Sequence, residues 1–131
     1  MLSILSFKII LKIFLIMKSS RYFLCWIYLA FAISGLIFPT LANIEYVKSY
    51  GPAFNIQHFI SLANINPAAQ SLSRDLFIGA GAVTVWIFAE ARRLKMKNLW
   101  IVISSFLVAF AFAAPLFLFL RERRLIEIDE P

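Results

Sequence analysis

Apolar and polar positions alternate in blocks along this chain, and three blocks contain no charged residue. They cover residues 22–42, 76–89 and 99–120. A helix rises about 1.5 Å per residue, so about 20 residues cross the roughly 30 Å hydrocarbon core of a bilayer. The pattern therefore predicts an all-α integral membrane protein, an up-down bundle with spans over about residues 22–42, 75–91 and 99–120.

The segment between the first two spans is the polar part of the chain. Residues 43–74 hold most of the Asn, Gln and Pro residues, which places them outside the hydrocarbon. Within this segment, apolar side chains alternate with polar ones, which predicts a short amphipathic surface helix: Phe54, Phe59, Ile60 and Leu62. Asn66-Pro67 is expected to end that helix. Ser71 or Ser73 is expected to cap the next one, with Asp75 in its first turn.

Prolines predict where the spans bend. Gly35 and Pro39 favour a kink or a stop near Phe38. Pro115 removes one backbone hydrogen bond and predicts a kink about four residues earlier. The polar tail over residues 121–131 is expected to be frayed.

Small residues predict where helices approach one another closely. Ala30 and Ser34 are spaced for contact on the first span, and Gly79 and Ala82 belong to a run of small residues on the second. On the third span, small residues recur every fourth position and predict a packing seam: Ser105, Ala109 and Ala113.

Residues 1–16 form an apolar and basic extension whose role the pattern leaves open. Lys8 and Lys12 share one helical face, and the run is short for a span. It could be a surface helix, a fourth crossing, or lie before the true start, since Met17 is itself a plausible first residue. We favour a surface helix or an extension over a crossing, with residues 17–131 as a single membrane domain.

The first span could also be read as a secretory signal. Lys18 and Arg21 would be its basic start, and Thr40-Leu41-Ala42 its cleavage site. The apolar part is longer than the 7–15 residues usual for a signal core, which favours a membrane span.

Composition supports a lipid environment. The chain is 62% hydrophobic and 15% charged, whereas soluble domains average about half apolar and a quarter charged. The net charge of +6 comes from basic residues that flank apolar runs, so we expect lipid rather than nucleic acid as the partner. Cys25, the single cysteine, cannot form an intrachain disulfide. We interpret Cys25 as a small hydrophobic residue within the span; the alternative is that its thiol is acylated.

Charge on the two sides of a three-span bundle is nearly balanced. One side would carry six cations: Lys18, Arg21, Arg92, Arg93, Lys95 and Lys97. The other would carry five: Lys48, Arg74, Arg121, Arg123 and Arg124. The short 92–97 turn weighs most, because basic residues in short loops stay in the cytoplasm. We therefore expect that turn and the N-terminus in the cytoplasm, and the C-terminus across the cell membrane.

A spaced set of residues resembles a known family. It consists of Asp75-Leu76, the Glu90–Met96 turn, Leu99-Trp100 and the Pro115–Arg123 segment. The chain resembles, from about Arg21 to Arg124, a family of short bacterial membrane proteins catalogued only as a domain of unknown function. The resemblance implies a multi-helix membrane protein and carries over no activity.

Glu90, Asp75 and Arg93 are the candidate functional residues. An ionisable residue in a membrane helix is a functional candidate by default, but Arg93 lies three residues after Glu90, the spacing of an ion pair. Fifteen residues separate Asp75 from Glu90, or about 22 Å along a helix, so they cannot act as one acid–base pair.

His58 is the only histidine, which argues against a haem or zinc site, and we expect no cofactor or metal.

Three functional classes remain open. The small size and absent motifs favour a non-enzymatic accessory subunit or assembly factor of a larger membrane complex. Its partners would be other membrane proteins or further copies of the chain. The alternative is an oligomeric transporter or channel that uses Glu90. A membrane enzyme acting on a lipid or isoprenoid is the third, and it would need Asp75 or Glu90 to face a cavity.

Overall fold

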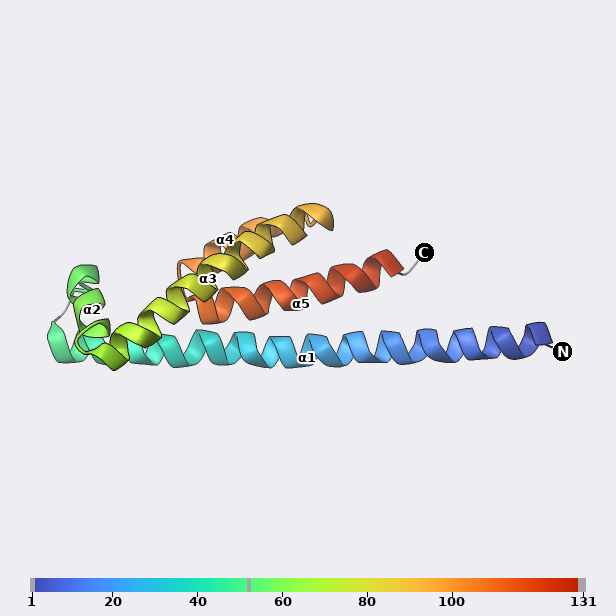
Figure 1. Cartoon of the computed structure of the whole chain (residues 1–131), viewed down its shortest axis with the longest axis horizontal. Coiled ribbons are helices and arrows are strands. Elements are labelled where there is room, and N and C mark those ends of the chain that lie inside the picture. The colour runs from blue at the N-terminus through green and yellow to red at the C-terminus, as the bar shows by residue number, and fades with distance from the viewer. Residues whose placement is uncertain (1, 52, 130–131) are drawn as a thin grey trace.

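The computed structural model describes residues 2–51 and 53–129, apart from the side chains at 2, 3, 14 and 17 (Figure 1). Over these residues the chain is entirely helical and has no strand. The helices are α1 (Leu2–Tyr50), α2 (Ile56–Ala63), α3 (Pro67–Arg93), α4 (Leu99–Phe106) and α5 (Phe110–Asp129). Two of them, α1 and α3, are long and apolar enough to cross a membrane. The predicted all-α class is confirmed.

The longest element, α1, is one unbroken helix of 49 residues. Pro39 lies inside it, so the predicted stop near Phe38 is wrong. A proline removes a single backbone hydrogen bond, and α1 is held on both sides of it. Before Pro39 the helix packs on α5, and after it Tyr46 packs against Phe59 of α2, with ring centroids 5.3 Å apart.

The N-terminal extension continues α1 in a straight line past the end of α5 (Figure 1). It is therefore not a separate element. Its apolar side chains are exposed, for example Phe7 and Ile10. Met17, the alternative start, falls within α1, and its side chain lies outside the described part of the chain.

Asparagine side chains begin both helices of the connecting region. The Asn55 side chain accepts a hydrogen bond from the His58 backbone N–H at 3.1 Å and caps α2. Asn66 accepts one from the Ala69 N–H at 2.9 Å and caps α3, whose first residue is Pro67. Proline is favoured there because the first helical N–H has no partner anyway.

The helix that contains the predicted second span therefore begins earlier than expected. Asp75 lies in the third turn of α3 instead of the first. The Ser73 hydroxyl donates to the Ala63 carbonyl at 2.7 Å, which ties α3 to the end of α2 instead of capping a helix.

The predicted third span is also wrong as a continuous helix. The helix α4 ends at Phe106, and α5 begins at Phe110 and runs through the tail to Asp129. The two helices are antiparallel, because Val102 near the middle of α4 packs with Phe117, while Asn98 and Leu120 line one pocket. The position of the kink expected from Pro115, about residue 111, falls in the first turn of α5, directly after the chain reverses. The tail that was expected to be frayed is helical up to Asp129; residues 130 and 131 lie outside the described part.

The helix α5 lies at the centre of the packing and contacts α1, α3 and α4. It is antiparallel to α1, since Arg21 pairs with Glu122 while Gly35 lies against Ala111. It is parallel to α3, since the Trp86 ring contacts Phe117 and Glu90 pairs with Arg121. The core of this assembly is made of four buried residues: Ile87, Ala91, Val102 and Phe117.

Helices pack closely at small residues, but most of these are not the small residues that the sequence indicated. On α1, Ala32 and Gly35 are buried, whereas Ala30 and Ser34 are exposed. A Cβ at Gly35 would overlap the Ala111 carbonyl, so only glycine allows this approach.

The other predicted packing residues divide into two groups. Ser105 and Ala113 are buried, at 4% and 0% exposure. They belong to different helices, with half-buried Ala109 in the loop between, so they form no single seam. Gly79 and Ala82 are exposed, and a Cβ at Gly79 would meet no atom within 4 Å.

Candidate functional site

Charged side chains from three helices meet at the level where α3 ends, and α1 continues about 28 Å beyond this level. Glu90 and Arg93 come from the last turn of α3, Arg121 and Glu122 from the middle of α5, and Arg21 from α1. The α4–α5 hairpin creates this meeting, because it brings residue 121 back to the level of residue 90. We call these five residues the ion-pair cluster.

Glu90 is the most heavily bonded member of the cluster. One carboxylate oxygen accepts from Arg93 Nη2 at 2.7 Å and from Arg121 Nε at 2.8 Å. The other oxygen accepts from Arg93 Nε at 2.8 Å. The residue is only 7% exposed. The predicted ion pair with Arg93 is present, and Arg121, which the sequence placed on the opposite side, is a second partner.

Arg121 and Glu122 carry the cluster from α3 to α1. Arg121 Nη1 donates to Glu122 at 3.0 Å, and its guanidinium lies 5.7 Å from the centroid of the Trp86 ring. Glu122 is 5% exposed and pairs with Arg21 at 3.5 Å. Arg21 also pairs with Asp129 at 3.3 Å. Alternating charges thus link all three long helices at one level.

Asp75 takes no part in this cluster. It lies on the same helix as Glu90, fifteen residues earlier, which is about 22 Å along the axis. Its side chain is exposed and has no ion-pair partner within the described residues. The expectation that Asp75 and Glu90 cannot share one site agrees with this geometry.

An aromatic cluster occupies the other end of the molecule. The Tyr46 hydroxyl lies 2.9 Å from His58 Nδ1 and donates to the Asn55 carbonyl at 3.1 Å. The His58 ring also packs on Tyr50, with centroids 5.0 Å apart. Among the described residues, no three potential metal-ligating side chains come together. His58 therefore reads as part of the packing between α1 and α2.

The ion-pair cluster is built as a helix clamp. Both Glu90 oxygens are occupied by guanidinium N–H groups, and Glu122 lies between two arginines. Hydrogen bonds between ionised groups are about twice as strong as neutral ones, and removing one partner leaves a buried charge uncompensated. The arrangement can therefore hold α1, α3 and α5 in register.

Fold and site together define an all-helical protein with two candidate membrane-spanning helices. The chain belongs to the family described as "Protein of unknown function DUF2834", whose profile matches residues 27–123. The match covers every member of the ion-pair cluster except Arg21 and leaves out the N-terminal extension. It confirms the family resemblance seen in the sequence. Searches of the curated proteins and of the solved structures each found no match.

Proposed function

We propose that the chain crosses the cell membrane twice, through α1 and α3, and inserts α4 and α5 as a hairpin that enters and leaves on one side. Eleven of the thirteen Lys and Arg residues then lie at the end that holds the ion-pair cluster, and only Lys48 and Arg74 at the other. This bias is far stronger than the near balance of a three-span bundle. By the positive-inside tendency, the cluster end faces the cytoplasm.

Within that membrane, the chain acts as a non-enzymatic accessory subunit or assembly factor. The main support for this role comes from the tip of the hairpin, residues 107–109, which lies deep in the proposed membrane and is uncovered. The apolar part of α5, residues 110–120, places the tip about 17 Å below the cluster, well inside a hydrocarbon core of about 30 Å. Irregular backbone at that depth is tolerated only where protein or a water-filled cavity covers it.

This chain leaves the tip uncovered. Leu107 is 90% exposed, the highest value among the large apolar side chains of the described residues. The face of α3 that carries Gly79 and Ala82 is open as well. A second membrane protein, or another copy of the chain, would supply the missing cover.

The alternatives have less support. A transporter using Glu90 needs a carboxylate that is free to exchange a proton or cation, whereas Glu90 accepts three guanidinium hydrogen bonds. A lipid-modifying enzyme needs Asp75 or Glu90 at a cavity, and among the described residues neither lines the cavities beside α5 or the one between α2 and α3.

The test is purification of the tagged chain in mild detergent, followed by native gels and mass spectrometry of what co-purifies. We expect a defined complex larger than the chain. Replacing Leu107 by alanine removes a side chain that contacts little of its own chain. Lipid is as apolar as leucine, so Leu107 would stabilise the complex by packing against the partner and not by leaving water. The many small van der Waals contacts that alanine would lose sum to about 1 kcal/mol or more, so the Leu107→Ala variant should weaken the complex about fivefold or more.

The matched control is Leu15→Ala, which removes an exposed leucine from the N-terminal part of α1, far along that helix from Gly35, which lies against α5 near the tip. It should leave the complex intact. A chain that stays monomeric in several mild detergents, or equal effects of both substitutions, would contradict the accessory role. Flux in proteoliposomes that Glu90→Gln abolishes would favour the transporter instead.

A further inference from the structure

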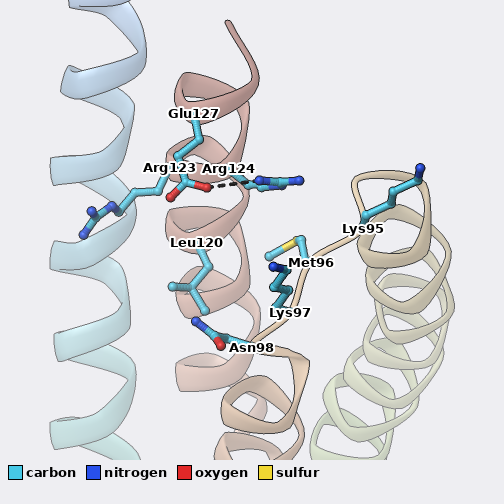
Figure 2. A pocket seen from close by; sticks show the side chains of 8 residues that line it. All are labelled: Lys95, Met96, Lys97, Asn98, Leu120, Arg123, Arg124 and Glu127. Carbon is cyan, nitrogen blue, oxygen red and sulfur yellow. Dashed lines mark hydrogen bonds and ion pairs between the residues drawn. The ribbon is translucent and has the colours of Figure 1, made fainter. Parts of the chain in front are cut away.

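A basic pocket lies between the α3–α4 turn and α5, next to the ion-pair cluster (Figure 2). Its volume is about 430 Å³, within the range of roughly 300–1,000 Å³ typical of small-molecule sites. Lys95 and Lys97 line it from the turn, and Arg123 and Arg124 from α5. Glu127 is the one acidic residue in the lining.

Most of this positive charge is not neutralised within the described part of the chain. Arg124 donates to the Leu94 carbonyl at 3.1 Å and pairs with Glu127 at 3.2 Å, which fixes the guanidinium beside the pocket. Lys95, Lys97 and Arg123 have no ion-pair partner among the described residues. The arginines at positions 21, 93 and 121, by contrast, are all paired. The pocket therefore carries an excess of three positive charges.

The lining is also partly apolar. Met96 and Leu120 lie between the basic residues in Figure 2, while the Lys95 and Arg123 side chains point outward in opposite directions, Arg123 toward α1. Leu120 is the last apolar residue of α5 before the charged segment that starts at Arg121. If the cluster end lies at the cytoplasmic face, the pocket sits where headgroups meet acyl chains.

We propose that this pocket binds the phosphate group of an anionic phospholipid. Basic pockets on the cytoplasmic side of membrane helices are suited to such headgroups, and Met96 and Leu120 would contact the start of the acyl chains. Lysine side chains are flexible, so Lys95 can turn from the rim onto a bound phosphate. The inference rests on the membrane placement proposed above, but not on the accessory role.

The test begins with insertion. The full chain is reconstituted in vesicles with equal amounts of phosphatidylglycerol and phosphatidylcholine, and flotation after an alkaline wash measures membrane integration. Failure here would overturn the membrane placement itself. Integrated protein is then extracted in mild detergent, and its retained lipids are measured by native mass spectrometry. We expect phosphatidylglycerol to be enriched; equal retention of both lipids would overturn the lipid site alone.

Variants then locate the site. Each basic residue near an anionic headgroup contributes about a fivefold change in binding. Lys97→Gln should lower the phosphatidylglycerol enrichment about fivefold, and the triple change K95Q/K97Q/R123Q well over tenfold. If the triple variant fails to integrate into the membrane, the phosphatidylglycerol enrichment of Lys97→Gln alone tests the site, and an unchanged enrichment would overturn it. The control, Arg92→Gln, removes an exposed neighbouring cation that does not line the pocket, and it should retain the enrichment.

A final arm separates lipid from free phosphate. Inorganic phosphate is added to the lipid-bound protein, with chloride at matched ionic strength as the control. For a lipid site, phosphate should release no more phosphatidylglycerol than chloride does. Selective release by phosphate, lost in Lys97→Gln, would overturn the lipid assignment and make the pocket a site for a free phosphate group.

Discussion

At the scale of single residues, local spacing predicted one ion pair and missed its more important partner. Glu90 and Arg93 are three residues apart on a helix, so their pairing follows from the sequence alone. Arg121 is 31 residues away and reaches Glu90 only because the chain turns back after Phe106. No local pattern contains that contact. Similarly, spacing indicated Ala30 and Ser34 for helix contact, while the position of α5 selects Ala32 and Gly35.

Removing the charge of Glu90 should destabilise the chain more than removing an exposed carboxylate. Glu90→Gln weakens hydrogen bonds from two guanidinium groups, each worth about 1.5–3 kcal/mol when a charge is involved, and we expect a loss of at least that size. The control Glu127→Gln breaks an exposed pair with Arg124, worth about 0–1 kcal/mol. Unfolding of the purified chain in mild detergent measures both. Equal losses would contradict the helix-clamp role.

Two glycine substitutions should have opposite effects on stability. Gly35→Ala forces a methyl group onto the Ala111 backbone, and overpacking of this kind costs about 1–3 kcal/mol. Gly81→Ala meets no atom within 4 Å and should stabilise its helix by up to about 1 kcal/mol. The same unfolding measurement on the isolated chain compares them. If Gly35→Ala were neutral, α1 and α5 would not pack as closely as described.

At the scale of helices, the sequence predicted the elements that local patterns define. It did not predict helix ends that depend on contacts between helices. The short α2 was expected from its alternating side chains, and it is present. The start of α3 was misplaced because Pro67 was read as a breaker, although it serves as the first helical residue. The break at residues 107–109 has no glycine or proline to announce it.

The physical reason for that break lies in the charges that follow. In a continuous helix from residue 99, Arg121 would lie about 33 Å from the 94–98 turn, and Glu90 and Glu122 would lose their shared partner. Reversing the chain joins these groups. The Ser105 hydroxyl donates to the Val102 carbonyl at 2.6 Å in the last turn of α4.

A cross-link should distinguish the hairpin from a continuous helix. Asn98 and Leu120 line one pocket, whereas 22 helical residues would hold them about 33 Å apart. On a Cys25→Ala background, cysteines at both positions should react together with a short bis-maleimide, as mass spectrometry of the linked peptides would show. A pair at Asn98 and Leu72, near opposite ends of α3, should not be linked. The reverse result would restore the single third span.

At the scale of the whole molecule, folding changes how the charges are distributed. In a three-span bundle, six basic residues would lie on one side of the membrane and five on the other. With the hairpin, Arg121, Arg123 and Arg124 join the N-terminal cations and the 92–97 turn at one end, leaving Lys48 and Arg74 at the other. The expectation that residues 121–124 lie on the opposite side from Arg21 is therefore wrong, since Arg21 is bonded to Glu122.

The location of the two termini tests this topology most directly. Two crossings and a hairpin place both ends of the chain on the cytoplasmic side, whereas three crossings place them on opposite sides. Reporter fusions at each end, active either in the cytoplasm or outside the cell membrane, can be expressed in a bacterial host. We predict cytoplasmic activity from both fusions. A cytoplasmic N-terminus with an external C-terminus would show that residues 99–120 cross the membrane as one helix and that the hairpin is not the structure in the bilayer.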